Sequence, residues 1–185
     1  MGTVMKEKTI WQDEKYFIIR REPSLTNLLP TKLRRGGLHE KLRWMVQYIY
    51  GYHVYILAEK KSGEKETGAA EIGYCFAGDG ASFRYTFARR GDVLIGPYFI
   101  LPEKRGQGLA AMLVTVCLKA ELSENGKAWE FIQHNNIASI RTAEKVGFEY
   151  YSECRYSRYL RILSSVNDAA GHEKLFCYGK EKADA

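Results

Sequence analysis

The sequence predicts a mixed α/β (α+β) fold in which helices flank a central, mostly antiparallel sheet. Runs rich in β-branched and aromatic residues are separated by glycine-containing turns, which favours antiparallel pairing of neighbouring strands. Helical segments then lie between the later strands, without the regular alternation of a βαβ array. Apolar residues make up 45% and charged residues 27% of the 185 positions, a balance typical of a folded globular protein.

The N-terminal part is expected to contain two strands around a helical stretch. The first strand is predicted at Lys15–Glu22 and the second at His53–Lys61. Between them, Ser24–Tyr50 is predicted to be helical with a break at Gly36–Gly37. Ser24 follows a proline, which is a signal for a helix start, and the part after the glycines has the better helical pattern.

Three more strands are predicted in the middle of the chain, at Ala70–Phe76, Phe83–Phe87 and Val93–Ile100. The sequences AGDGAS and ARRGD lie between them. Glycine and aspartate in these positions favour tight reversals, so antiparallel pairing is expected here.

The C-terminal part is predicted to contain two helices and three strands. Apolar residues with the i, i+3, i+4, i+7 spacing of a buried helical face follow Gly108; they are Leu109, Met112, Leu113, Val116, Cys117 and Ala120. The remaining elements are a strand at Ala128–Gln133, a helix at Asn136–Val146 closed by Gly147, and β-rich runs at Glu149–Leu160 and Lys174–Lys180, separated by a loop at Leu163–Glu173.

Charge and cysteine content limit the classes of function. Lys and Arg total 28 and Asp and Glu total 22, so the net charge is +6, which suits an anionic ligand or a nucleic acid without selecting either. The four widely spaced cysteines form no CxxC pair, so neither a zinc site nor a disulfide framework is expected. No apolar run is long enough to span a membrane, and the first residues lack a signal-peptide core. We expect a cytoplasmic protein.

The segment Leu101–Val114, LPEKRGQGLAAMLV, places two glycines at the entrance of a predicted helix. Glycine destabilises a helix by about 1 kcal/mol relative to alanine. The first turn of a helix has N–H groups without internal partners and about half a positive charge from the helix dipole. Gly106 and Gly108 would let a phosphate approach these amides. The segment therefore predicts an anion-binding site, although glycines in a plain turn would give the same pattern.

Two nucleotide-binding motifs share glycines with this segment. Gly106, Gly108 and Ala111 match the GxGxxG/A dinucleotide fingerprint, but that motif follows directly from a strand in a βαβ unit. Here Pro102–Arg105 intervenes. A P-loop needs GK[ST] after its second glycine, and Leu109 follows Gly108 instead. Neither motif explains the segment.

Residues 100–110, ILPEKRGQGLA, resemble the V-x-P-E-x-R-G-x-G-x-G/A signature of the GNAT superfamily of acyl-CoA-dependent N-acyltransferases. Residues 136–148, NIASIRTAEKVGF, resemble its second motif, N-x-x-A/S followed by GF. The resemblance implies one GNAT-like domain over residues 1–185, with an acetyl-CoA-binding core at about 93–148. It also implies a cleft where the strand Val93–Ile100 parts from the strand around Trp129–Gln133.

In proteins similar to these motifs, acetyl-CoA is the cosubstrate and no metal is required. The resemblance implies that the pyrophosphate rests on the amides of Arg105–Ala110, that the pantetheine follows the strand ending at Ile100, and that Asn136 helps to hold it. The implied cosubstrate-binding residues are Phe99, Ile100, Arg105, Gly106, Gln107, Gly108, Leu109, Ala110, Asn136 and Ser139. Asn136 could equally cap its helix.

The chemistry requires a base more than an acid. Deprotonating an amine with a pKa of about 10.4 at pH 7 corresponds to about 4–5 kcal/mol, whereas releasing a thiolate with a pKa of about 8.5 corresponds to about 2 kcal/mol. Many relatives place a tyrosine seven residues after the motif asparagine, where this chain has Ala143. The combination of Ser139 with no tyrosine resembles the branch that includes ribosomal-protein N-terminal acetyltransferases, which implies Ser139 as the acid. A helix serine that only bonds the backbone is the alternative.

Asp92, at the start of a strand that lines the implied cleft, and Glu71, on a neighbouring strand, are our candidates for the general base. Carboxylates at strand ends beside turns are usually solvated, so a solvated carboxylate without a catalytic role is the alternative for each. Tyr98, beside Pro97, is expected to line the acceptor site.

The function expected from the resemblance is an N-acetyltransferase that moves an acetyl group from acetyl-CoA to a primary amine of a small molecule or protein N-terminus, in a ternary complex. Two alternatives stay open. One is a CoA-sensing domain without turnover, and the other is a basic nucleic-acid-binding protein, suggested by Thr31–Gly37, TKLRRGG. No membrane partner is expected, nucleic acid is not favoured, and a homodimer stays open. No motif identifies the amine.

Overall fold

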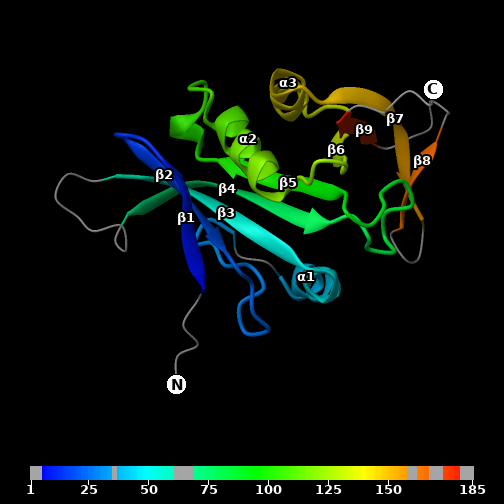
Figure 1. The fold of residues 1–185 in the computed structure, drawn as a ribbon, viewed down its shortest axis with the longest axis horizontal. Coiled ribbons are helices and arrows are strands. Elements are labelled where there is room, and N and C mark those ends of the chain that lie inside the picture. Colours follow the sequence, from blue (N-terminus) through cyan, green and yellow to red (C-terminus); the bar gives the residue numbers. More distant parts are fainter. Residues whose placement is uncertain (1–5, 35–36, 61–68, 158–161, 167–172, 180–185) are drawn as a thin grey trace. The chain divides into compact units, whose positions relative to one another are not determined.

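The computed structural model describes residues 6–34, 37–60, 69–157, 162–166 and 173–179. The chain forms two compact units. Figure 1 labels its helices and strands along the sequence. The first unit contains Met1–Gly78 and Gly96–Ala120, and the second contains Asp79–Ile95 and Glu121–Ala185. Each unit thus combines segments that are distant in sequence. The single domain predicted over residues 1–185 stays a prediction.

The first unit is built on antiparallel strands. β1 pairs with β2, β2 with β3, and β3 with β4, each in antiparallel register. Its elements are β1 (Glu7–Gln12), β2 (Tyr16–Arg21), α1 (Leu38–Tyr50), β3 (Tyr52–Glu59), β4 (Ala70–Asp79), the second part of β5 (Val93–Ile100), the short 3₁₀ helix η2 (Pro102–Lys104) and α2 (Leu109–Glu121).

The second unit is also mostly antiparallel. β9 lies between β6 and β7 and pairs antiparallel with both, and β7 pairs antiparallel with β8. The first part of β5 pairs in parallel with β6 at Val93 and Leu94 alone. The other elements of this unit are β6 (Ala128–Gln133), α3 (Ile137–Val146), β7 (Glu149–Tyr156), β8 (Leu163–Val166) and β9 (Glu173–Tyr178).

The predicted mixed and mostly antiparallel architecture is confirmed, and β5 has the predicted bounds. The predicted helix over residues 24–34 is wrong. Ser24 and Asn27 bond each other's backbones in a tight turn, and the Ser24 hydroxyl accepts a further hydrogen bond from Asn27 N at 3.1 Å. Pro30 has no N–H for a helical hydrogen bond. These contacts replace the helix with an irregular segment.

Three further elements differ from the prediction. The predicted strand Phe83–Phe87 is a series of turns in which Tyr85 forms a single bridge to Leu163. β1 was not predicted, because its largely exposed residues lack a clear alternating pattern. β8 occupies the start of the predicted loop Leu163–Glu173, and the rest of that loop up to residue 172 lies outside the described residues.

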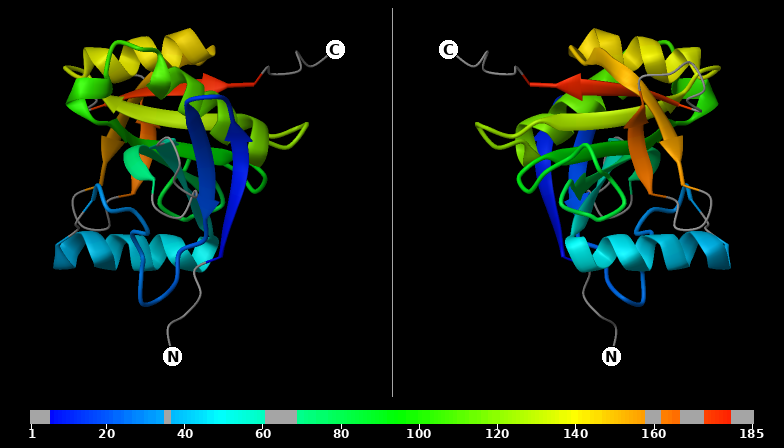
Figure 2. Two further views of the ribbon diagram at one scale, coloured as in Figure 1. Left: turned by 90° about the vertical axis from the view of Figure 1, so that its left-hand side faces the viewer. Right: turned by 90° about the vertical axis from the view of Figure 1, so that its right-hand side faces the viewer.

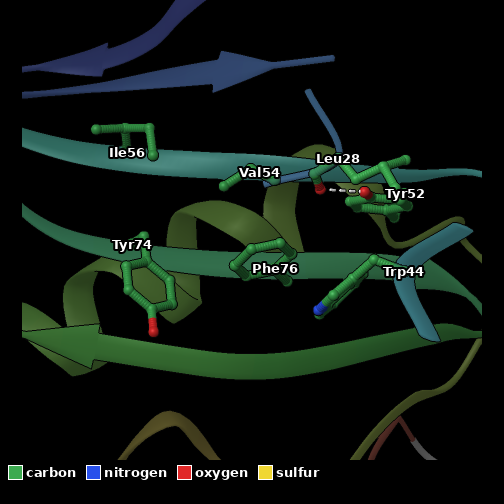
Figure 3. Close-up of a cluster of buried hydrophobic side chains, with 7 residues drawn as sticks. All are labelled: Leu28, Trp44, Tyr52, Val54, Ile56, Tyr74 and Phe76. Atoms are coloured by element: carbon green, nitrogen blue, oxygen red, sulfur yellow. Dashed lines mark hydrogen bonds between the residues drawn. The ribbon is translucent and has the colours of Figure 1, made fainter. Parts of the chain in front are cut away.

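The core of the first unit is an aromatic cluster (Figure 3). It is formed by Leu28, Trp44, Tyr52, Val54, Ile56, Tyr74 and Phe76. The Trp44 ring centroid lies 4.3 Å from that of Phe76 and 4.8 Å from that of Tyr52. Trp44 therefore fixes α1 against β3 and β4.

The helix α2 is apolar on several sides and contributes six buried residues, including Leu113 and Val114 with no exposed surface. Such a helix is stable only when its sides are covered by other elements. None of the helices in the described part of the chain is long and apolar enough to span a membrane.

The approach of β4 to the end of β5 requires a glycine at position 73. A Cβ there would lie 2.5 Å from Ile100 Cδ1 and 2.8 Å from the Phe99 carbonyl oxygen. We predict that Gly73→Ala lowers the free energy of unfolding by about 2 kcal/mol, because an added methyl group in a packed site forces its neighbours apart. Urea denaturation measures the change.

Gly37→Ser is the matched control for this prediction. Gly37 is the N-cap residue of α1 with extended backbone at φ −70°, and a Cβ there would have no atom within 4 Å. Serine is at least as favourable as glycine at an N-cap, so this substitution should change stability by less than about 0.5 kcal/mol. Equal effects of the two substitutions would contradict the close packing of β4 and β5.

Candidate functional site

The glycine loop, residues 105–108, joins η2 to α2 directly after β5. Gly106 has φ 78° and Gly108 has φ 76°, the left-handed region that residues with a Cβ seldom adopt. Arg105 Nε donates a hydrogen bond to the Ile100 carbonyl at 3.0 Å, and its guanidinium lies 5.5 Å from the Phe99 ring centroid. Arg105 thus fixes the loop to the end of β5.

The amides of this loop are open to solvent. Residues 105–108 are exposed, and within the described residues no group accepts a hydrogen bond from the amides of Gly106–Ala110. The first helical bond of α2 runs from Met112 N to the Gly108 carbonyl at 3.1 Å. The space in front of Gly106 is empty within 4 Å of where a Cβ would lie. Several N–H groups at a helix N-terminus with room in front of them fit an anion such as a diphosphate.

Contacts from distant segments support the loop. Tyr16 of β2 donates a hydrogen bond from its hydroxyl to Gln107 Oε1 at 3.3 Å. Lys104 Nζ bonds Glu59 Oε2 of β3 at 2.5 Å, and this hydrogen bond is the main cause that lowers the pKa of Glu59. Sequence reasoning missed Tyr16 and Glu59, because no local pattern connects residues that are so far apart in the chain.

Glu71 is the centre of a buried polar cluster in the first unit. Its carboxylate accepts hydrogen bonds from Arg21 Nη1 at 2.5 Å, the Thr31 hydroxyl at 2.9 Å and Lys32 N at 2.7 Å. Arg21 also donates to the Pro30 carbonyl at 3.1 Å. Glu71 therefore ties the irregular segment before α1 to the sheet, and its assignment as the general base stays a prediction.

The predicted acceptor residue, Tyr98, lies half-buried on β5. Its neighbour Phe99 stacks on Tyr74 of β4 with ring centroids 5.8 Å apart. The end of β5 thus joins the glycine loop to the aromatic cluster. The role of Tyr98 toward an acceptor stays a prediction.

Asp92 organises the second unit at the start of β5. Its carboxylate accepts hydrogen bonds from Arg89 N at 2.9 Å, Lys127 N at 3.0 Å and Trp129 Nε1 at 2.9 Å. These donors come from the turn before β5 and from the start of β6. Asp92 therefore has a structural role whatever its part in proton transfer, and its assignment as the base also stays a prediction.

Asn136 caps α3 in the second unit. Its side-chain oxygen accepts a hydrogen bond from Ser139 N at 3.3 Å, and Gly147 ends the helix with φ 102°. The capping role that the sequence allowed for Asn136 is thereby confirmed. This cap uses only the side-chain oxygen of Asn136. Ala143, at the position where the sequence motif often has a tyrosine, has no exposed surface.

The predicted site residues divide between the two units. Glu71, Tyr98, Phe99, Ile100 and the loop Arg105–Ala110 belong to the first unit, and Asp92, Asn136 and Ser139 belong to the second. Within the first unit, the structure brings Phe99, Ile100 and the loop together through Arg105.

These features define a class: mixed α/β proteins in which a glycine loop with open amides begins a helix after a central strand. The family model described as "Acetyltransferase (GNAT) family" matches residues 38–148, more than half of the chain. The chain belongs to this acetyltransferase family, and it is an acyltransferase. The resemblance found in the sequence motifs is confirmed.

Solved structures share the fold. A ribosomal-protein-S5-alanine acetyltransferase from Vibrio fischeri is 15% identical, with a TM-score of 0.53 over 95% of this chain and 98% of that chain. RimL, a ribosomal L7/L12 α-N-protein acetyltransferase, is 12% identical, with a TM-score of 0.53 over 93% and 94%. An acetyltransferase from Agrobacterium tumefaciens is 12% identical, with a TM-score of 0.53 over 97% and 99%. A search of curated proteins finds no match.

Proposed function

We propose that the protein transfers an acetyl group from acetyl-CoA to a primary amine of a small molecule or a protein N-terminus, by direct attack of the amine in a ternary complex. The observation that carries this proposal is the set of open amides at Gly106–Ala110. Membership of an acetyltransferase family supports the transfer reaction. A screen that detects thiol release from acetyl-CoA with different amines tests the proposal and identifies the acceptor.

The residues of the first unit fit the elongated cosubstrate. The loop amides would hold the pyrophosphate, because N–H groups and the helix dipole both favour negative charge. The backbone of β5 near Phe99 and Ile100 would hydrogen-bond the amides of the pantetheine, as a sheet edge binds an extended chain. When bound, acetyl-CoA supplies an acetyl thioester that an amine can attack.

The reaction needs two proton transfers, and different residues of the chain are the candidates for each. A base must remove the proton of the attacking ammonium, which corresponds to about 4–5 kcal/mol at pH 7. Asp92 and Glu71 are the candidates, and each would have to keep its structural hydrogen bonds while accepting that proton. Ser139 is the candidate that protonates the leaving thiolate, a smaller task of about 2 kcal/mol.

Arg34, in the basic run Thr31–Gly37, gives little support to the nucleic-acid alternative; residues 35 and 36 of this run lie outside the described residues. Arg34 Nε donates a hydrogen bond to Glu40 Oε1 at 2.6 Å, and its Nη1 donates to the Tyr74 hydroxyl at 3.3 Å. Its charge is therefore paired within the first unit. Binding to nucleic acid would be driven by unpaired cations that contact phosphates.

The first test of the proposed function is direct binding of CoA. At one hundred times its dissociation constant, a ligand stabilises the folded state by about 2.7 kcal/mol, which raises the melting temperature by several degrees. We expect this shift with CoA and not with NAD, and we expect Gly108→Glu to abolish it, because a carboxylate would stand where the pyrophosphate binds. Differential scanning fluorimetry measures the shift.

Gly37→Glu introduces the same charge at an open glycine of the same unit and should retain the response to CoA. Gly108→Gln separates the bulk of the side chain from its charge. If Gly108→Glu folds and responds to CoA like the parent protein, the glycine loop does not hold the cosubstrate.

The second test separates the acid from the base. Ser139→Ala should lower turnover by about tenfold to a hundredfold, the lower end of a general-acid effect, and leave the Michaelis constant for acetyl-CoA unchanged. Removing the base should lower turnover more near pH 7 and allow partial recovery at higher pH, where more of the amine is neutral. The measurement is a pH profile of turnover for Asp92→Asn and Glu71→Gln.

Stability measurements on the same variants distinguish proton transfer from structure. Asp92→Asn keeps only one acceptor oxygen for three donors, so its free energy of unfolding should fall by about 2 kcal/mol. Glu124→Gln, an exposed change in the same unit, should alter neither stability nor turnover. A variant that is destabilised but keeps the parent pH profile has lost a structural carboxylate and not the base.

A further inference from the structure

Tyr16 contacts the glycine loop from the start of β2. Figure 2 shows β2 paired with β1, both in blue. Tyr16 has 7% exposure, and its backbone N–H donates a hydrogen bond to Asp13 Oδ1 at 2.6 Å. The Asp13 N–H in turn donates to the Tyr16 carbonyl at 2.9 Å. These contacts hold Tyr16 in place, so its hydroxyl meets Gln107 from a fixed position.

Gln107 is the residue of the loop whose side chain can block the open amides. It lies between Gly106 and Gly108 and is exposed. A side-chain oxygen near a helix N-terminus accepts hydrogen bonds from the free N–H groups there, as a phosphate oxygen does. The glutamine side chain is flexible and long enough to turn back toward the amides that follow it. A released Gln107 would therefore compete with an anion for the same donors.

The observed hydrogen bond prevents this competition. The Tyr16 hydroxyl donates to Gln107 Oε1 at 3.3 Å, which directs this oxygen toward β2. Among the described residues, no group accepts a hydrogen bond from the amides of Gly106–Ala110. A side chain that is fixed before the ligand arrives also loses less conformational freedom on binding. The loop is thus kept ready for an anion.

The charge beside Tyr16 favours this direction of the hydrogen bond. Lys15 Nζ lies 5.0 Å from the centroid of the Tyr16 ring, and the interaction with Tyr16 is the main cause that raises the pKa of Lys15. A cation attracts the oxygen of a hydroxyl and repels its hydrogen. The hydroxyl hydrogen is therefore available to Gln107, and the glutamine turns its oxygen toward it.

We propose that Tyr16 is a positioning residue for the cosubstrate, because its hydroxyl holds Gln107 Oε1 away from the amides of the glycine loop. This role rests on the proposed binding of CoA at that loop. Tyr16 acts through Gln107 and needs no contact of its own with the cosubstrate. Its hydroxyl should therefore affect the affinity for CoA and not the chemical step.

Isothermal titration calorimetry with CoA tests the role of Tyr16. Tyr16→Phe should weaken the binding of CoA about threefold to tenfold, the range that corresponds to one hydrogen bond between neutral groups. With an amine accepted in the thiol-release screen, the Michaelis constant for acetyl-CoA should rise by the same factor and kcat should not change.

A second substitution separates positioning from a structural role. Gln107→Met keeps a long side chain and removes its amide oxygen, so adding it to Tyr16→Phe should restore the affinity of the parent protein for CoA. Loss of a purely structural contact would not be reversed in this way. Tyr52→Phe is the matched control, because the Tyr52 hydroxyl also donates one hydrogen bond within the first unit, to the Leu28 carbonyl (Figure 3). It should lower stability and leave the affinity for CoA unchanged.

Hydrogen exchange of the ligand-free protein, followed by NMR spectroscopy, tests the same role without CoA. Tyr16→Phe should slow the exchange of the amides of residues 108–110, because the released Gln107 oxygen accepts hydrogen bonds from them. Adding Gln107→Met should return the exchange to the fast rate of the parent protein.

The outcomes distinguish this role from the proposed function. A parent protein that does not bind CoA would contradict the proposed function, and the role of Tyr16 with it. Binding of CoA that Tyr16→Phe leaves unchanged would overturn the role of Tyr16 alone. So would a loss of affinity that Gln107→Met does not reverse, or amide exchange that Tyr16→Phe does not slow.

Discussion

The open amides at the start of α2 are the feature on which the rest of the site depends. Backbone N–H groups are fixed dipoles, so they bind an anion without any rearrangement once the chain holds them in place. Gly106 and Gly108 allow the required backbone turn through their positive φ values. Arg105 ties the loop to the end of β5 by donating a hydrogen bond to the Ile100 carbonyl.

The packing of several strands in the first unit positions this loop. Gly73 lets β4 approach the end of β5 closely, and Phe99 stacks on Tyr74 within the same pair of strands. Tyr16 of β2 contacts Gln107 in the loop, and Glu59 of β3 contacts Lys104 of η2 beside it. The loop and the adjoining η2 are thereby held by contacts from β2, β3 and β5.

Features that depend on local chemistry were predictable from the sequence. β5 was found with its bounds, and α3 was found from its asparagine at the start and its glycine at the end. The glycine loop was recognised because its composition conflicts with helix propensity unless something requires a bare backbone. The helix predicted for residues 24–34 was wrong, because the hydrogen bonds of Ser24 and Asn27 outweigh the start signal.

Features that depend on contacts between distant residues were not predictable. The bond between Tyr16 and Gln107 joins residues 91 positions apart, and that between Arg21 and Glu71 joins residues 50 positions apart. No periodicity in a single sequence reveals such pairs. For the same reason, the structural roles of Glu71 and Asp92 emerged only from their hydrogen-bond partners in the folded chain.

The central claim is that the amides of the glycine loop bind the pyrophosphate of CoA, and backbone NMR spectroscopy tests it most directly. During a titration with CoA, the amide resonances of residues 106–110 should shift strongly. Pantetheine, which has no pyrophosphate, should leave those resonances in place. Loop resonances that do not move at saturating CoA, or that move equally with pantetheine, would contradict the account.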